Sequence, residues 1–282
     1  MAQSACRCWN QISGDGKRKR VREKLVAVAP FLCSCPRVAT LGIRYSIADY
    51  TPQQRKMLVS ASQILFPTQR FVKILHAAGK ITFPSYFTYS VQKSRLMQEV
   101  LFQFLKCPHP LTRIYYGHQK SSIIEGFSFP LKAMGPKMTD NARLVSNECD
   151  LNIISKVYNP LIIQEVLNYR ERFRLLFVNY ECSGVLKRIP EVELGRFGGC
   201  AVPSDSCLDQ VEVPVCLGGE IVSYLEKFLR SVQIDDIAAE IGITGDGWRL
   251  IELSRPPVYW KTAAGPINRF SLISSMIESN LL

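Results

Sequence analysis

The feature that most constrains how this 282-residue chain folds is a pair of strand-like patterns near its C-terminal end. Residues 236–244 and 248–253 are rich in β-branched and apolar side chains. Between them lies Gly245-Asp246-Gly247, and glycine and aspartate tolerate the positive φ that tight turns require. The sequence therefore predicts a β-hairpin with a three-residue loop.

The register of this hairpin has a chemical consequence. A three-residue loop pairs Thr244 with Trp248, and counting back places Glu240 directly across from Glu252. Cross-strand neighbours have Cβ atoms ~5 Å apart, and like charges at that separation destabilise a sheet unless something positive lies between them. Ser254 shares their face because side chains alternate along a strand. A loop of two or four residues would instead put the two carboxylates on opposite faces.

Two carboxylates and a hydroxyl on one face are all hard oxygen ligands. Such a set suits Mg²⁺ or Mn²⁺ better than zinc. A solvated sheet edge that holds no metal is the alternative interpretation of the same residues.

The rest of the chain alternates between strand-like and helix-like patterns, which predicts an α/β fold. Strands are expected at residues 24–32, 64–66, 112–116, 127–133, 161–167, 173–179 and 183–188. Helices are expected at residues 53–62, 69–78, 89–105 and 219–232. The helix at 89–105 is expected to bury Leu96, Val100, Leu101 and Phe104.

Composition excludes several classes of protein. With 47% hydrophobic and 21% charged residues, the chain fits a folded soluble protein rather than a disordered, collagen-like or coiled-coil one. Its longest apolar runs fall short of the ~18 residues that span a bilayer, and its start lacks the pattern of a secretory signal. The ten cysteines are therefore expected to stay reduced, and the pairs Cys6/Cys8 and Cys33/Cys35 lack the usual spacing of a zinc site.

The net charge of +11 is confined to one end of the chain. Residues 1–80 contain 14 Lys and Arg against 3 Asp and Glu, whereas the remainder is balanced. The densest cluster, residues 17–22, is expected to be a solvated basic arm. Contact with nucleic acid, an anionic lipid or an acidic substrate is the alternative for that cluster.

Residues 237–257, which include the hairpin, resemble the metal-binding hairpin of ATP-grasp proteins, where two acidic residues and usually an asparagine bind two magnesium ions. The resemblance implies that Glu240, Glu252 and Ser254 hold Mg²⁺ or Mn²⁺, with Ser254 in the place of the asparagine.

Three further segments match the same family in the same order, so that the resemblance covers roughly residues 80–260. Lys93, followed by a helix and Pro-His-Pro-Leu-Thr at 108–112, is similar to the lysine and turn that open the family's central subdomain. Phe-Pro-Leu-Lys, ending at Lys132, resembles the strand whose lysine contacts the ATP phosphates. Leu-Ile-Ile-Gln-Glu-Val, at 161–166, resembles the strand and hinge that hold adenine.

The resemblance implies a set of binding residues. Those expected to bind ATP are Lys93, Lys132, Gln164, Glu165 and Val166. Arg174 and Arg188 are expected to be catalytic, because a planar guanidinium forks onto two oxygens of a γ-phosphate or an acyl-phosphate.

The implied architecture is an α/β (α+β) ATP-grasp fold in three subdomains. After a basic arm at 1–23, we expect an N-terminal preATP-grasp α/β subdomain at 24–84, a small central subdomain at 85–165 and a C-terminal mixed-sheet subdomain at 166–282 with the metal-binding hairpin.

The implied function is that of an ATP-dependent, magnesium-requiring ligase of the cytoplasm. Such an enzyme phosphorylates a carboxylate and lets an amine or other nucleophile attack the acyl-phosphate, forming a carbon–nitrogen or carbon–sulfur bond. The partners are then ATP and small-molecule or peptide acids and amines, with no membrane; nucleic acid is not favoured, and a homodimer is left open.

Two alternatives remain from the sequence. After Lys132 the chain has one glycine, Gly135, and a proline, where the family has a glycine-rich loop over the phosphates. A catalytically inactive ATP-binding or interaction protein on the same fold is therefore the first alternative. A basic nucleic-acid-binding protein that uses residues 17–22 is the second.

Overall fold

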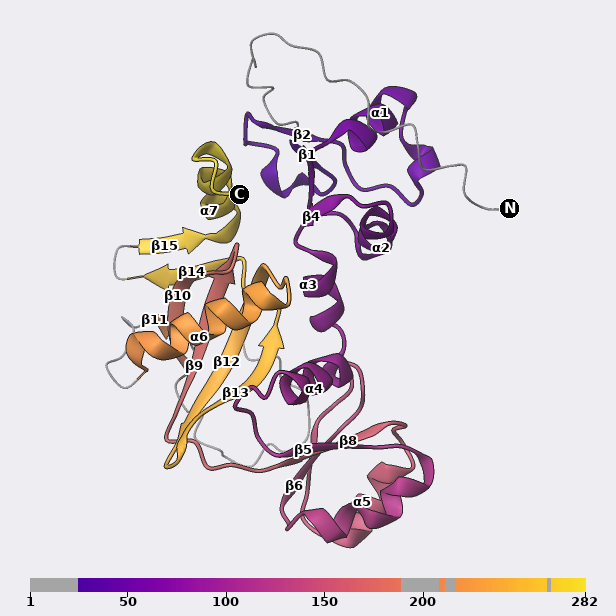
Figure 1. Ribbon diagram of the computed structural model, residues 1–282, viewed down its shortest axis with the longest axis vertical. Helices are drawn as coiled ribbons and strands as arrows, with labels where there is room; N and C mark the ends of the chain where they lie inside the picture. Colours follow the sequence, from indigo (N-terminus) through magenta and orange to yellow (C-terminus); the bar gives the residue numbers. More distant parts are fainter. Residues whose placement is uncertain (1–24, 189–207, 211–216, 263–264) are drawn as a thin grey trace.

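The computed structural model describes residues 25–188, 208–210, 217–262 and 265–282. These residues form four sheets, and the three larger ones follow one another along the long axis of the molecule (Figure 1). A small parallel sheet lies at one end, a five-stranded antiparallel sheet in the middle and a four-stranded antiparallel sheet at the other end.

The N-terminal sheet is built from short parallel strands in the order β2-β1-β3-β4. Its elements are β1 (Leu25–Ala27), η1 (Pro30–Leu32), β2 (Val38–Thr40), η2 (Ile47–Asp49), α1 (Pro52–Ser60), β3 (Gln63–Leu65), α2 (Gln69–Ala77) and β4 (Ile81–Phe83). Helix α1 begins with a capping box: the Thr51 hydroxyl accepts from the amide of Gln54, whose side chain accepts from the amide of Thr51.

Two helices, α3 (Tyr86–Val91) and α4 (Arg95–Phe104), lead out of this sheet. The single helix predicted at 89–105 is wrong, because the chain breaks after Val91 and Ser94 caps a new helix by accepting from the amide of Met97. The predicted inner face is wrong in part: Leu101 packs against the core, as expected, but two of the four residues do not. Val100 and Phe104 are exposed, and the buried side chains of α4 are Arg95, Gln98, Glu99 and Phe102.

The four-stranded sheet has the order β5-β8-β6-β7 with antiparallel neighbours. Its elements are β5 (Thr112–Tyr115), η3 (Gly117–Gly126), β6 (Leu131–Met134), β7 (Arg143–Val145), α5 (Glu148–Ser155) and β8 (Leu161–Glu165). One face packs on α5 through Leu131, Ala133, Leu161 and Ile163. Because side chains alternate, Lys132 and Gln164 lie on the other face.

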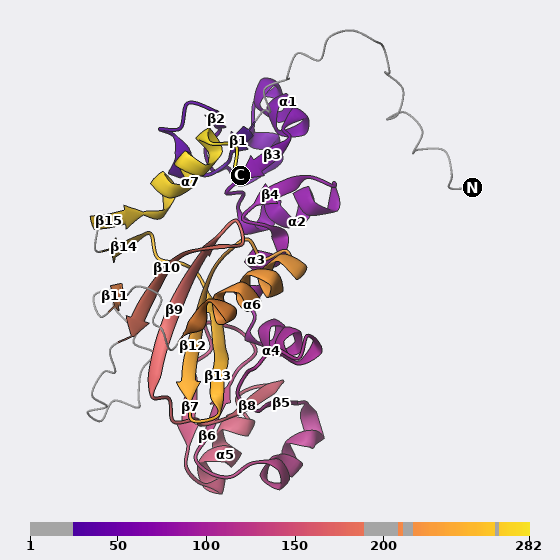
Figure 2. The same cartoon turned by 60° about the vertical axis from the view of Figure 1, so that its left-hand side comes forward.

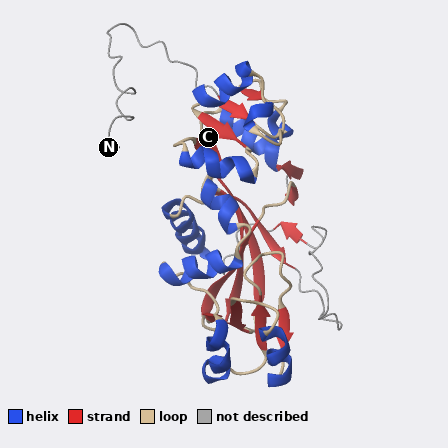
Figure 3. Ribbon diagram, turned by 90° about the vertical axis from the view of Figure 1, so that its right-hand side faces the viewer, coloured by secondary structure: helices blue, strands red, loops and turns tan. Residues whose placement is uncertain are grey.

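The middle sheet has the order β11-β10-β9-β12-β13. Its elements are β9 (Glu171–Val178), β10 (Glu181–Arg188), β11 (Leu208–Gln210), α6 (Gly218–Ser231), β12 (Asp236–Thr244) and β13 (Gly247–Ser254). Helix α6 covers one face of this sheet (Figures 1 and 3). Its apolar residues Leu225, Phe228 and Leu229 are buried there, together with Phe102 of α4.

The end of the chain returns to the N-terminal sheet. Strands β14 (Tyr259–Thr262) and β15 (Gly265–Asn268) form a small ribbon, and α7 (Arg269–Glu278) then lies beside β1 and β2 (Figure 2). Ile273 and Ile277 of α7 are buried with Leu25 and Ala27 of β1. The sequence patterns did not predict α5, α7 or the β14–β15 ribbon.

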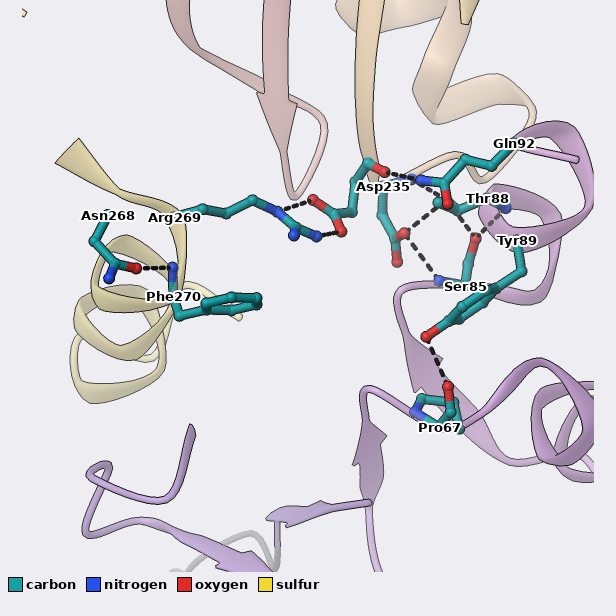
Figure 4. A network of polar contacts seen from close by, with 10 residues as sticks. Pro67, Ser85, Thr88, Tyr89, Gln92, Asp235, Asn268, Arg269 and Phe270 are labelled. Carbon is teal, nitrogen blue, oxygen red and sulfur yellow. Dashed lines mark hydrogen bonds and ion pairs between the residues drawn. The ribbon is translucent and has the colours of Figure 1, made fainter. Parts of the chain in front are cut away.

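A buried polar network joins the starts of α3, β12 and α7 (Figure 4). Arg269, at the start of α7, forms an ion pair with Asp236 at the start of β12. The neighbouring carboxylate of Asp235 accepts from the Ser85 amide and the Thr88 hydroxyl, both at 2.9 Å. These contacts tie the first turn of α3 to the middle sheet, so the linker between the sheets has a fixed position.

Other predictions concern residue classes. The five described cysteines, Cys33, Cys35, Cys107, Cys149 and Cys182, are free thiols; the remaining five and the basic cluster at 17–22 lie outside the described residues. Within the described ranges, no helix combines the length and the apolar character needed to cross a bilayer.

Burial predicts a pH effect on stability at Asp235. Burial raises the pKa of Asp235 from 3.8 to about 6, although the Ser85 amide and the Thr88 hydroxyl partly oppose this. Since the folded pKa lies above the unfolded one, ionising Asp235 costs stability as pH rises from about 4 to about 6. The Asp235→Asn variant keeps an oxygen to accept both bonds and has no such cost.

We therefore expect the unfolding free energy of Asp235→Asn, relative to wild type, to rise by about 3 kcal/mol between pH 4 and pH 7.5. Urea denaturation of both proteins at the two pH values measures this difference. A difference that stays constant with pH would contradict the assignment.

Candidate functional site

The hairpin of β12 and β13 brings the two predicted carboxylates together, although not through the predicted loop. Thr244 pairs with Gly247, so the loop has two residues, and the predicted pairing of Thr244 with Trp248 is wrong. With a two-residue loop, a regular ladder would place Glu240 opposite Ile251. A β-bulge between Ile241 and Glu240 inserts one extra residue in β13 and restores the Glu240–Glu252 pair.

The same bulge sorts the side chains of β13 between the two faces of the sheet. Leu250 and Leu253 both lie in the core under α6, although residues three apart in a regular strand point to opposite faces. The bulge therefore turns Glu252 and Ser254 to the face that α6 does not cover. Glu240 is on that face as well, since its neighbours Ala239 and Ile241 are in the core.

Two arginines of β9 supply positive charge beside these carboxylates. Arg172 forms an ion pair with Glu240, whose side chain is only 15% exposed. Arg174 is the register partner of Glu240, and its Nη2 donates to Ser254 Oγ at 3.3 Å and to the Arg255 carbonyl at 2.8 Å. The structure thus brings Glu240, Ser254 and Arg174 to one place.

The four-stranded sheet contributes a row of polar side chains across three strands. Thr112 of β5, Gln164 of β8 and Lys132 of β6 are consecutive register partners. Lys132 Nζ donates to Gln164 Oε1 at 3.4 Å, and Gln164 Nε2 donates to Thr112 Oγ1 at 3.1 Å. Gln164 is thus a side-chain bridge inside this row.

The two groups of residues are close enough for their charges to interact. Burial raises the pKa of Glu252, and the negative charge of Glu240 raises it further, whereas Lys132, Arg95 and Arg174 lower it. Burial lowers the pKa of Lys132, which the charges of Glu252 and Glu240 counteract. The site is therefore one electrostatic unit made from the faces of two sheets.

Arg95, at the start of α4, fixes the loop that follows Lys132. Its Nη1 donates to the carbonyls of Gly135, Lys137 and Asp140, at 2.9 to 3.2 Å. The Asp140 carboxylate accepts from the Lys137 amide at 2.8 Å. In place of a glycine-rich loop, the chain has a loop bonded to a helix end by a buried guanidinium.

The remaining predicted residues have different surroundings. Lys93 is exposed and donates to the Gln69 side chain of α2. The Glu165 carboxylate accepts from the Leu111 amide at 2.6 Å, and Val166 follows the end of β8 with its side chain 46% exposed. Arg188 ends β10, and its side chain lies outside the described residues. Nothing in these positions tests their proposed roles.

Three charged residues of the site were not found from the sequence. Arg172 lies two positions before Arg174 on the same strand, so the alternation of side chains was a signal for it. Arg95 and Glu99 lie on a face of α4 that the apolar pattern wrongly assigned to solvent, and we find no sequence signal for them. Among the described residues, no group of three or more His, Cys, Asp and Glu forms a metal cluster.

Comparisons with solved structures identify this arrangement. The RimK domain ATP-grasp protein of Sphaerobacter thermophilus is similar over 82% of this chain and 90% of its own, with 13% identity and a TM-score of 0.56. The D-alanine–D-alanine ligase of Bacillus anthracis, solved with ATP, is similar over 91% of this chain and 96% of its own, with 8% identity and a TM-score of 0.62.

A third neighbour is the ATP-grasp ligase PsnB, solved with a minimal precursor, at 11% identity and a TM-score of 0.58 over 82% of this chain and 90% of its own. No family model matches the sequence, and no curated protein matches it. The chain therefore has the ATP-grasp fold, and the predicted mixed α/β fold class is confirmed.

The contacts of Arg95 generate a prediction about the loop after Lys132. Hydrogen bonds from a charged donor contribute about 1.5–3 kcal/mol, so we expect Arg95→Met to speed amide hydrogen exchange at Lys137 and Asp140 by about tenfold or more. The exposed Arg143→Met serves as the matched control and should leave these amides unchanged. Equal exchange in Arg95→Met and wild type would show that Arg95 does not hold the loop.

Proposed function

We propose that this protein is an ATP-dependent, magnesium-requiring ligase that activates a carboxylate as an acyl-phosphate for attack by an amine or another nucleophile. The observation that carries the proposal is the Glu240–Glu252 pair, which a β-bulge turns toward Lys132 on an ATP-grasp fold. Two of the three neighbours described above are named as ligases, PsnB as an ATP-grasp ligase and the Bacillus anthracis protein as a D-alanine–D-alanine ligase, and the latter was solved with ATP.

The residues at the hairpin fit a hard divalent cation. The negative charge of Glu240 raises the pKa of Glu252, and a cation bound between the two carboxylates would remove that effect. Ser254 adds a hydroxyl oxygen on the same face. Glu240, Glu252 and Ser254 would therefore hold Mg²⁺ or Mn²⁺, which neutralises phosphate charge when it is bound.

The residues proposed for ATP divide between its two ends. Lys132, largely enclosed and next to the carboxylates, would contact phosphate, and Lys93 would do so from the end of α3. Glu165 and Val166, at the end of β8, would lie beside adenine, while the Gln164 side chain supports Lys132. This division between phosphate and adenine is the one that the resemblance to ATP-grasp proteins implies.

The proposed reaction has two steps. An oxygen of the acid attacks the γ-phosphorus of ATP, the bond to the β-phosphate oxygen breaks, and ADP leaves. The nucleophile then attacks the acyl carbon and phosphate leaves, with one proton released from an amine. Arg174, and Arg188 at the end of β10, would stabilise the transferring phosphoryl group, because guanidinium donors fork onto two oxygens.

The finer features of the proposal rest on the same resemblance. They are a cytoplasmic location, formation of a carbon–nitrogen or a carbon–sulfur bond, and small-molecule or peptide acids and amines as substrates. A homodimer is left open.

Turnover tests the role of Glu252. A screen of acids and amines for ATP-dependent phosphate release should find activity, and Glu252→Gln should reduce it at least 100-fold, because one metal ligand loses its charge. Asp246→Asn, in the turn of the same hairpin, removes an exposed carboxylate and should keep wild-type activity. Full activity in Glu252→Gln would overturn its assignment as a ligand.

Nucleotide binding separates the proposed enzyme from its alternatives. Calorimetric titration with a non-hydrolysable ATP analogue should show binding of ~8 kcal/mol, a dissociation constant of about 1 μM, that requires Mg²⁺ and is lost in Lys132→Ala. The control is Lys156→Ala, which removes an exposed lysine at the end of α5 and should bind the analogue like wild type.

Three other outcomes of these experiments have definite meanings. Binding without phosphate release for any acid would favour an inactive ATP-binding or interaction protein. Failure to bind in every condition would overturn the proposal. RNA or DNA binding that is lost when residues 1–23 are deleted would favour the nucleic-acid alternative.

A further inference from the structure

One buried carboxyl group beside the site, that of Glu99, has been given no role so far. Glu99 of α4 is 3% exposed, and its Oε2 has no hydrogen-bond partner among the described residues. Burial raises the pKa of Glu99 to about 7, and the Thr112 hydroxyl, Lys132 and Arg95 oppose that rise. A carboxylate that is buried and incompletely hydrogen-bonded costs stability.

The neighbouring residue shows that α4 does not need this charge. Gln98 is buried as well, yet its amide donates to the Leu253 carbonyl at 2.6 Å and accepts from the Leu253 amide at 2.9 Å. Gln98 thus anchors α4 to β13 with both ends of its side chain bonded. Glu99 instead accepts one long hydrogen bond, from Gln164 Nε2 to its Oε1 at 3.5 Å, and its Oε2 has no hydrogen-bond partner among the described residues.

The position of Glu99 relates it to Lys132 through a single side chain. Gln164 Nε2 faces Glu99 Oε1 at 3.5 Å, and Gln164 Oε1 accepts from Lys132 Nζ at 3.4 Å. The amide of Gln164 therefore separates an anion on α4 from a cation on β6. Arg95 is the other cation facing Glu99, and its Nη1 is occupied by three loop carbonyls.

The remaining charge near Glu99 is a second carboxylate. Glu252 of β13 is negative and contributes to the raised pKa of Glu99. Lys132 is thus the cation that Glu99 shares with the hairpin carboxylates, and any phosphate that reaches Lys132 adds negative charge on the far side of Gln164. The carboxylate and the phosphate then compete for one ammonium group.

We propose that Glu99 is a built-in counter-anion of Lys132 that weakens the binding of phosphate at this site and so favours release of the nucleotide. The inference rests on the proposed function, because it assigns phosphate to Lys132. Glu99 acts through Gln164 and does not touch the nucleotide, so it is a positioning residue that sets affinity.

The proposal predicts the opposite of what loss of a binding residue would cause. In Glu99→Gln the repulsion is removed while the shape of the side chain is kept. A unit charge acting over several ångströms in a partly buried site changes affinity by about tenfold. At pH 8, above the pKa of about 7 of Glu99, the side chain is mostly ionised. At that pH we expect Glu99→Gln to bind Mg²⁺–ADP about tenfold more tightly than wild type, and to bind adenosine, which has no phosphate, with unchanged affinity.

The same substitution should raise the melting temperature of the ligand-free protein, because a buried, incompletely bonded carboxylate becomes a neutral amide. A residue needed only for packing would lower the melting temperature and weaken both ligands. Glu99→Met, of similar size and without a charge, should also tighten Mg²⁺–ADP selectively and serves as the second variant. Glu125→Gln, which removes an exposed carboxylate from η3, is the matched control and should change neither affinity.

Isothermal titration of wild type and the three variants with Mg²⁺–ADP and with adenosine decides the matter. Selective tightening of Mg²⁺–ADP in Glu99→Gln and Glu99→Met supports the proposal. Unchanged or weaker Mg²⁺–ADP binding in these variants, with clear binding to wild type, overturns the role of Glu99 alone. Failure of wild type to bind either ligand overturns the ATP site itself, and the role of Glu99 with it.

Discussion

The repulsion between Glu240 of β12 and Glu252 of β13 is the constraint on which the rest of the site depends. Two carboxylates that face each other across neighbouring strands destabilise a sheet unless positive charge lies nearby. Here that charge comes from Arg172 and Arg174 on the next strand and from Lys132 on a different sheet. The middle sheet and the four-stranded sheet are thereby coupled through charge as well as through the helices between them.

Backbone geometry makes that constraint possible. The two-residue turn of the hairpin alone would have put the carboxylates on opposite faces, and one extra residue in β13 corrects the register. As a result, Leu250 and Leu253 of β13 are both buried in the core, and Glu252 and Ser254 lie on the other face of the sheet. Buried polar contacts of α3 and α7 with Asp235 and Asp236 then hold this sheet against the N-terminal part of the chain.

Much of the fold was predictable because the relevant signals are local. The cap at Thr51, the apolar face of α6 and the hairpin with its Glu240–Glu252 pair all follow from nearby residues. The Glu240–Glu252 pair was predicted from a loop of the wrong length. One bulged residue in β13 gives the same register beyond it as a loop that is one residue longer. The buried face of α4 was not predictable, because Arg95 and Glu99 are buried by two sheets that are distant in sequence, and its apolar Val100 and Phe104 face solvent.

The central claim is that the carboxylate pair holds a divalent cation together with a nucleotide. Mn²⁺ is a paramagnetic substitute for Mg²⁺, and electron paramagnetic resonance measures its free concentration directly. In the presence of a non-hydrolysable ATP analogue, wild type should bind Mn²⁺ beyond what the analogue binds alone, and the double variant Glu240→Gln/Glu252→Gln should not. Equal Mn²⁺ binding by both proteins would contradict the account.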